Sequence, residues 1–187
     1  LIRSEERFLM AMDAVNDGVF EWDLKANEVY YSPRNYNMLG YEVNEFEPKH
    51  AVWESMIHEE DKANNLAEFQ RHLRGESEMY ELEYRVRTKS GQYKWISERG
   101  KILERDKTGN PIRIIGIHSD IDARKAMEEN LRNEAEFINN LMNIAPVGIF
   151  IVTVDGKIPF ANDLAIQMIR LKPGQDGYYN VPQYKVY

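Results

Sequence analysis

Residues 80–122 decide the fold, and they read YELEYRVRTKSGQYKWISERGKILERDKTGNPIRIIGIHSDID. Apolar and polar side chains alternate over 80–86, and this two-residue period is typical of a half-buried strand. A turn containing glycine leads to a second strand over about 93–103, and a polar turn leads to a third over about 112–121. The stretch therefore predicts three antiparallel strands joined by short turns.

The residues before this meander predict a hairpin followed by helices. Phe20, Trp22 and Leu24 recur at every second position, as in a half-buried strand. Ser32 followed by Pro33 is typical of a helix start. The elements expected here are a helix over 4–15, strands over 18–24 and 28–31, a short helix over 33–39, helical turns within 43–58 and a helix over 61–74. This order predicts an α+β fold in which a five-stranded antiparallel sheet carries helices on one face.

Beyond Asp122 the sequence predicts one long amphipathic connector helix. Its apolar residues follow a seam with heptad-like spacing: Met127, Leu131, Ile138, Leu141 and Ala145. A narrow seam between broad charged flanks favours a short parallel coiled coil between two chains. The alternative is a helix that packs on its own domain.

A shift of 130 positions places the end of the chain on its beginning. Residues 16–20, NDGVF, fall on 146–150, PVGIF, and Tyr30 falls on Phe160 without a gap. A tandem duplication is the simplest account. The domains expected are 1–122, a coiled-coil-like connector over 123–145, and the N-terminal part of a second copy over 146–187, truncated from a longer protein.

Composition and charge exclude several classes of site and partner. The chain has 187 residues, a net charge of −7 and no cysteine. Without clustered Lys and Arg, neither nucleic acid nor an anionic membrane surface is expected as a partner. Without cysteine there is no disulfide, thiolate zinc site or covalent thiol photochemistry. No run approaches the roughly 20 apolar residues that span a bilayer, so no direct membrane contact is expected. The lack of cysteine fits a reducing setting, and we expect a cytoplasmic protein.

Six groups of short motifs, taken in order, resemble those of one family. They are SEERF (4–8), NDGVFEWDL (16–24), YSP (31–33) with MLGY (38–41), IHEED (57–61), YRVR (84–87) with GQYKWI (91–96), and IGIHSDID (115–122). Residues 4–122 thereby resemble a PAS domain with its C-terminal PAC portion, a sensory box of the PAS-3-like subclass. Residues 137–187 resemble the start of a second PAS domain.

This resemblance implies a sheet with the spatial strand order 2-1-5-4-3 and a role in signal transduction. It implies a sensory or signal-relay module whose effector lies in the same chain, as in a sensor histidine kinase of a two-component system or a diguanylate cyclase. We therefore expect the fragment itself not to be an enzyme. The family usually ends its last strand with Asp-Ile-Thr, where this chain has Asp120, Ile121 and Asp122. Asp caps a helix about as well as Thr does, so the end of the strand should be preserved.

The aromatic residues of the first domain predict either a ligand cavity or an ordinary core. The side chains that would line a cavity are Trp22, Tyr30, Tyr36, Trp53, Tyr84, Trp95 and His118. Packing without a ligand is the alternative, because aromatic side chains dominate many cores. A ligand pocket also needs a few polar groups that point inward.

No cofactor is required by the sequence, although a small molecule could occupy such a cavity. Haem is not expected, because the candidate ligand His72 reads as a partly exposed helical residue. A flavin is not expected either, since the cysteine of the light-sensing subclass is missing. No residue spacing indicates a metal site, and His58 is expected to cap the helix that follows it.

The expected site of signal relay is the junction, by which we mean Asp120, Ile121 and Asp122. The first two residues end the last strand and Asp122 begins the connector, so a shift in the sheet would rotate or tilt the helix. In a homodimer formed through the terminal helices, this movement would reach the next domain. Two alternatives stay open: a ligand-free dimerisation scaffold, and an enzyme whose site carries no recognisable motif. We expect no catalytic residues.

Overall fold

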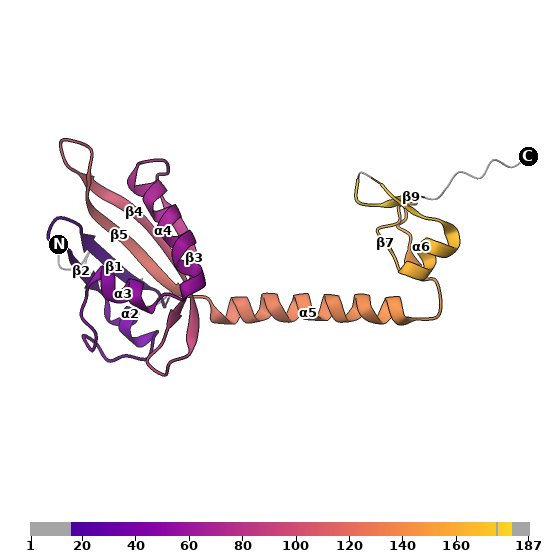
Figure 1. Ribbon diagram of the computed structural model, residues 1–187, viewed down its shortest axis with the longest axis horizontal. Helices are drawn as coiled ribbons and strands as arrows, with labels where there is room; N and C mark the ends of the chain where they lie inside the picture. Colours follow the sequence, from indigo (N-terminus) through magenta and orange to yellow (C-terminus); the bar gives the residue numbers. More distant parts are fainter. Residues whose placement is uncertain (1–15, 175, 181–187) are drawn as a thin grey trace, which may run out of the picture. The chain divides into compact units, whose positions relative to one another are not determined.

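The computed structural model describes residues 16–174 and 176–180. The chain divides after Lys125 into two compact units (Figure 1). The helix expected over 4–15 lies outside the described residues. In the described ranges, no helix is both long enough and apolar enough to cross a bilayer.

The first unit is built on a five-stranded antiparallel sheet formed by described residues. Its strands are β1 (Gly18–Asp23), β2 (Glu28–Tyr31), β3 (Tyr80–Arg87), β4 (Tyr93–Arg105) and β5 (Pro111–Asp120). Their order is β2-β1-β5-β4-β3, which confirms the order implied by the family resemblance. In the β1–β5 pair, Gly18 lies opposite His118, so the two ends of the domain meet in the middle of the sheet.

In the part of the chain that the structure describes, three helices cover one face of this sheet (Figure 1). They are α2 (Pro33–Asn37), α3 (His50–Met56) and α4 (Glu59–Leu73). The expected cap at His58 is confirmed, because its Nδ1 accepts the backbone N–H of Glu60 at 3.3 Å. This cap starts α4 two residues before the expected Asp61. Ser32 does not cap α2 with its side chain, which accepts the N–H of Val19 at 3.0 Å and so ties the helix start to β1.

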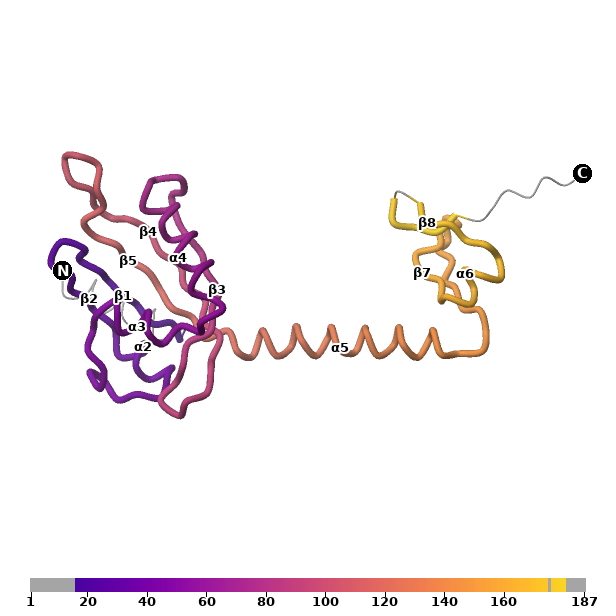
Figure 2. Tube along the Cα trace, in the orientation of Figure 1, coloured from indigo at the N-terminus to yellow at the C-terminus, as the bar shows by residue number. Residues whose placement is uncertain are grey.

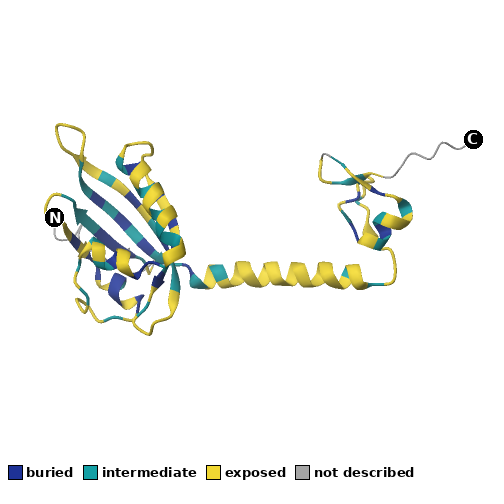
Figure 3. Ribbon diagram, viewed as in Figure 1, coloured by how far each residue is buried: buried dark blue, intermediate teal, exposed yellow. Residues whose placement is uncertain are grey.

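The core of the first unit lies between the sheet and the helices (Figure 3). Val86, Ile96 and Ile114 are completely buried at its centre. His72 is also buried, so the expectation of a partly exposed residue was wrong. Its ring packs against Tyr80, with centroids 4.9 Å apart, and its Nδ1 donates to the carbonyl of Ser77 at 3.0 Å. The position of His72 beside the apolar face of α4 was not enough to predict its burial, because residues that follow the helix, Ser77 and Tyr80, also contact the ring.

The helix expected beyond Asp122 is confirmed as α5 (Asp122–Ile144). Every residue of α5 is exposed or half-buried (Figure 3). The seam residues Met127, Leu131, Ile138 and Leu141 are 66%, 62%, 53% and 52% exposed. The described chain thus presents an uncovered apolar seam along α5.

The second unit repeats the opening of the first, as Figure 2 traces. Its elements after α5 are β6 (Phe150–Ile151), β7 (Phe160–Ala161), α6 (Asp163–Ile169), β8 (Lys172–Pro173) and β9 (Tyr179–Asn180). Phe150 lies opposite Ala161 in the β6–β7 pair, as Phe20 lies opposite Tyr31 in the β1–β2 pair. The strand register therefore keeps the shift of 130 residues found in the sequence.

The two copies differ where the first strand meets the following helix. A Cβ atom on Gly18 would come within 2.6 Å of Cγ of the buried Asn35, so glycine is required there. At the equivalent positions Gly148 faces Ala165, and the nearest atom to an added Cβ is 3.2 Å away. The first copy thus accommodates a large polar side chain that the second copy lacks.

Candidate functional site

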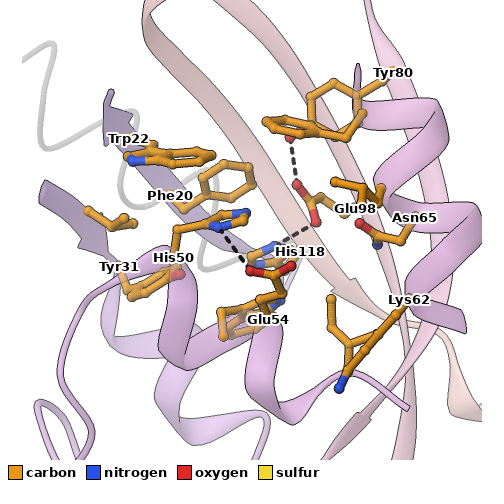
Figure 4. A pocket seen from close by; sticks show the side chains of 15 residues that line it. Phe20, Trp22, Tyr31, His50, Glu54, Lys62, Asn65, Tyr80, Glu98 and His118 are labelled. Atoms are coloured by element: carbon orange, nitrogen blue, oxygen red, sulfur yellow. Dashed lines mark hydrogen bonds and ion pairs between the residues drawn. The ribbon is translucent and has the colours of Figure 1, made fainter. Parts of the chain in front are cut away.

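A small cavity lies between the inner face of the sheet and helices α3 and α4 (Figure 4). Its volume is about 40 Å³, which is room for a few ordered waters or a very small ligand. Aromatic and aliphatic side chains form much of the wall. The polar members are His50, Glu54, Lys62, Asn65, Glu98 and His118.

The structure brings together part of the side-chain set expected at a cavity. Trp22, Trp53 and His118 line it. Tyr36 and Tyr84 are completely buried in the adjoining core. Three of the expected residues therefore line the cavity, and two others belong to the core beside it.

Tyr30 and Trp95 lie outside the cavity, contrary to expectation. Successive side chains of a strand point to opposite faces. Tyr30 is 54% exposed because its neighbour Tyr31 points into the core. Trp95 is displaced from the core in the same way by the completely buried Ile96, and the ammonium of Lys125 lies 4.9 Å from its ring centroid.

His118 on β5 is enclosed by rings and by one amide. Its ring stacks between those of Trp53 and Phe20, with centroid distances of 4.1 and 4.6 Å. Its Nδ1 lies 2.8 Å from Oδ1 of Asn35. The Asn35 amide nitrogen donates to the carbonyl of Val19 at 2.6 Å, so the oxygen is the atom that faces the imidazole. An amide oxygen can only accept, and Nδ1 of His118 therefore carries a proton.

Glu98 on β4 lies opposite His118, and it was not among the site residues predicted from the sequence. Its side chain is 14% exposed. The hydroxyl of Tyr80 donates to Oε1 at 2.5 Å, and the hydroxyl of Tyr84 donates to Oε2. Burial raises the pKa of Glu98, but the bonds from His118, Tyr80 and Tyr84 outweigh it and hold that pKa below its ordinary value. Glu98 is thus an ionised group in the core.

The pattern of β4 contained a signal for Glu98. Ile96, Gly100 and Ile102 lie an even number of residues from Glu98 along the strand, so they belong to the same inner face of the sheet. A carboxylate within such an apolar row has to find partners on neighbouring elements. Those partners come from β3 and β5, and the indole N–H of Trp53 extends the network to α3 by donating to the hydroxyl of Tyr84 at 3.0 Å.

Two further N–H groups at the cavity have no hydrogen-bond partner among the described residues. They are Nε1 of Trp22 and Nδ2 of Asn65, and both are buried. The ring of Trp22 stacks on His50 with centroids 4.0 Å apart. An occupant with an acceptor oxygen could satisfy these donors. Among residues 16–174 and 176–180, no cluster of three His, Asp or Glu side chains is placed to hold a metal ion.

The junction forms a second site, where β4 and β5 meet the start of α5. Asp120 accepts a bond from Nζ of Lys94 at 2.7 Å. Asp122 accepts the backbone N–H of Trp95 at 2.7 Å, and the N–H of Ile121 donates to the carbonyl of Trp95 at 3.0 Å. Each of the three junction residues is therefore bonded to β4.

Glu83 on β3 adds a contact that the sequence did not indicate. Its carboxylate binds Arg124 at 2.6 Å and Lys125 at 2.7 Å. Lys125 also lies over the ring of Trp95. The first turn of α5 is consequently attached to β3 and β4, and Trp95 belongs to this site rather than to the cavity.

Two family models match the chain in tandem. The model described as PAS fold matches residues 28–118, and the model described as PAS domain matches residues 136–185. A solved structure, the sensory box histidine kinase/response regulator from Burkholderia thailandensis E264, is 34% identical with a TM-score of 0.63. The match covers 72% of this chain and 98% of that chain.

Two curated proteins are also similar in sequence. The Escherichia coli (strain K12) protein named "Probable diguanylate cyclase DgcE" is 26% identical over 164 residues, which are 87% of this chain and 14% of that protein. The methyl sulfide methyltransferase-associated sensor of Methanosarcina acetivorans is 28% identical over 131 residues, 68% of this chain and 13% of that protein. The chain thus spans a small part of the length of these relatives. It belongs to the PAS domain family and is a sensory signalling module.

Proposed function

We propose that this module relays a conformational signal from its sheet to α5 through the junction. The observation that supports the proposal is the double attachment of Asp122. This residue is the first of α5, and its carboxylate also accepts the backbone N–H of Trp95 on β4 at 2.7 Å. A movement of β4 against β5 has to carry the helix start with it or break this bond.

The neighbouring ion pairs give the relay two distinct arrangements. Lys94 and Asp120 are about one quarter exposed, and Glu83 holds two cations of the first helical turn. Separating any of these partly exposed pairs costs a modest amount of free energy, because each charge would lose its partner. The helix start is then either attached to the sheet or released from it, and a signal would act by biasing these two states.

The uncovered seam of α5 supports a homodimer as the partner arrangement. Leu131 and Ile138 are more than half exposed on a helix that also carries many charged and polar side chains. Two such helices in parallel would bury the seam as a coiled coil. The competing function is a ligand-free dimerisation scaffold, which would use the same seam without any change at the junction.

The output domain of this relay is proposed to lie in the same polypeptide. The similar proteins include one named as a diguanylate cyclase and one named as a histidine kinase, and this chain matches only a small part of each curated relative. We propose a cyclase or a kinase as the effector, in the cytoplasm, with no catalytic role for the module itself.

The cavity supports a small ligand rather than a large cofactor. Its volume of about 40 Å³ is far below the roughly 300–1,000 Å³ of pockets for drug-sized ligands. Haem or a flavin would need a large rearrangement of the aromatic wall. An absorption spectrum together with native mass spectrometry tests this point, since a Soret or flavin band would overturn it.

The relay is tested with Asp120→Ala and Asp122→Ala in the full-length protein that carries the module. Both variants should change effector output, because the first removes a bond between the end of β5 and β4 and the second removes the bond between the start of α5 and β4. Glu104→Gln is the control, since it removes a carboxylate from an exposed position of β4. Unchanged output in both junction variants, with native folding, would leave the scaffold as the better account.

A further inference from the structure

Arg85 on β3 is attached to the start of α4 by both its backbone and its side chain. The N–H of His58 donates to the carbonyl of Arg85 at 2.8 Å, and the N–H of Arg85 donates to Oδ2 of Asp61 at 2.9 Å. The guanidinium also binds both oxygens of Asp61, through Nε at 2.9 Å and Nη2 at 2.7 Å. A bidentate pair of this kind fixes direction as well as distance. Arg85 therefore has to follow a movement of the start of α4.

The indole of Trp95 on β4 contacts two cations that come from different elements. Cζ of Arg85 lies 5.4 Å from the ring centroid, and Nζ of Lys125 in the first turn of α5 lies 4.9 Å from it. Both distances are within the range of about 6 Å over which an aromatic face attracts a cation. Arg85 and Trp95 are also opposite one another in the β3–β4 register. The ring is thus shared by a residue bound to α4 and a residue of α5.

We propose that the Trp95 indole is the positioning group that couples α4 to the start of α5, so that a displacement of α4 changes how firmly α5 is held. The inference rests on the relay proposed above, and it names α4 as the element through which the input reaches the junction. Lys62, Asn65 and Phe69 of α4 line the cavity (Figure 4). A change in the contents of the cavity therefore acts on the helix that holds Arg85.

The side chain of Trp95 supplies a connection that the bonds of Asp120 and Asp122 do not. Those bonds involve β4, β5 and the helix start, whereas the contacts through the ring begin at Asp61 on α4. The side chains of Asp61 and Lys125 are 17% and 26% exposed, so solvent screens their charges only in part. Lys125 has a second bond, to Glu83 at 2.7 Å. Loss of the ring contact should consequently loosen the first turn of α5 without detaching it.

The competing role for Trp95 is a structural one, in which the ring only covers apolar surface on the outer face of the sheet. The two roles differ in what they require of residue 95. An attraction between cation and ring is strongest for Trp, weaker for Phe and absent for Leu. Covering apolar surface needs only an apolar side chain, and it is independent of the bond between Arg85 and Asp61.

The test measures hydrogen exchange at the amide of Lys125 in the 187-residue chain. This amide donates to the carbonyl of Ile121 at 2.9 Å, so its exchange reports opening of the first turn of α5. Trp95→Leu should accelerate the exchange by about fivefold, the effect of losing a partly buried contact between cation and ring. Trp95→Phe should give an intermediate rate, and it takes the place of Trp95→Leu if that variant does not fold.

A second substitution tests the connection to α4. Asp61→Asn removes the charge that holds Arg85 at the ring, and it should accelerate exchange at Lys125 by about threefold. In the Trp95→Leu background the same substitution should have no further effect, because the connection is already broken. Glu68→Gln is the matched control, since it removes an ion pair with Arg71 from another part of α4. It should leave the rate unchanged.

Equal effects of Asp61→Asn in the two backgrounds, or an unchanged rate in Trp95→Leu and Trp95→Phe, overturn the inference. Effector output in the full-length protein separates this result from the relay itself. If Asp120→Ala alters output and Trp95→Leu does not, the relay stands and its input does not pass through Trp95. If neither Asp120→Ala nor Asp122→Ala alters output, the relay falls and this inference falls with it.

Discussion

Ser32 and Asn162 hold the same position in the two copies, and each accepts the backbone N–H of the residue 13 positions earlier. The acceptors are Oγ of Ser32, 3.0 Å from N of Val19, and Oδ1 of Asn162, 2.9 Å from N of Ile149. The backbone N–H of each residue donates back to the same strand residue, at 2.9 and 2.8 Å. The helix after the hairpin is therefore fastened to the first strand by the same pair of bonds in both copies.

Replacement of Asn162 by Ala should destabilise the second unit by about 1–3 kcal/mol, because it removes a helix cap and leaves buried partners unsatisfied. Oδ1 of Asn162 also accepts the N–H of Ala165, and its Nδ2 donates to the carbonyls of Met142 and Val147. Hydrogen exchange at Ile149 and Ala165 would report the loss. Asn162→Ser is the control, since serine makes the strand bond in the first copy; equal exchange in the Ala and Ser variants would contradict the assignment.

Tyr84→Phe should destabilise the first unit by about 1–3 kcal/mol, the cost of leaving a buried donor unpaired. The hydroxyl of Tyr84 accepts from Trp53 and donates to Glu98, so both lose a partner. Urea unfolding followed by tryptophan fluorescence would measure the change. Tyr93→Phe, at a 48% exposed position, is the matched control.

The same substitution should change the response to acid. The pKa of Glu98 is held below its ordinary value of 4.5, so its contribution to stability is present above pH 4.5 and is lost as the pH falls through the lowered pKa. Removing the hydroxyl of Tyr84 removes one of the bonds that lower this pKa. Acid unfolding of Tyr84→Phe should therefore begin at a higher pH. The role of this bond would be contradicted if the pH midpoint of acid unfolding rose no further than the lower stability of the variant at neutral pH accounts for.

His72 should make the first unit less stable in mild acid. Burial lowers the pKa of its imidazole from the ordinary value of 6.5, although the bond to Ser77 opposes this effect. The neutral ring is thus favoured in the fold, and stability is fully present above about pH 6.5 and declines as the pH falls through the lowered pKa. The free energy of unfolding of His72→Gln should vary less between pH 7.5 and 5. Gln70→Ala, at an exposed position of the same helix, should retain the slope of the unmodified chain.

Leu131→Asp should shift the chain from dimer to monomer in sedimentation experiments, since the charge would lie in the seam of the proposed coiled coil. Asn133→Asp introduces the same charge at a position outside the seam, and it should leave the dimer intact. A monomeric unmodified chain, or equal effects of the two variants, would contradict the seam. The result is independent of the junction, because Leu131 lies beyond the first turn of α5.

The fold could be predicted because its evidence is local. Alternation over 80–86 and the turns between strands depend on neighbours in sequence, and the motifs then fix the strand order. Burial of Ile96 rather than Trp95 could not be predicted from residue size. The larger ring was expected inside, but the register of β4 places it on the outer face, where Lys125 covers it.

The candidate site was harder to predict because its bonds join distant segments. His118 meets Asn35 from 83 residues away, and Tyr84 meets Glu98 across a turn. Neither Asn35 nor Glu98 is an unusual residue in its own stretch of sequence. Their importance follows from the fold, which brings Asn35 of α2 to Nδ1 of His118 and Glu98 of β4 to Nε2 of the same ring.

The overlap between Gly18 and Asn35 restricts the order in which these positions can change during evolution. A side chain cannot appear at residue 18 while Asn35 fills the space, so Asn35 must first become smaller. Loss of Asn35 would in turn free the imidazole of His118 from its amide acceptor. The second copy, with Gly148 and Ala165, already has the smaller side chain. Descendants of this module should therefore lose the polar partner of the histidine before they lose the glycine.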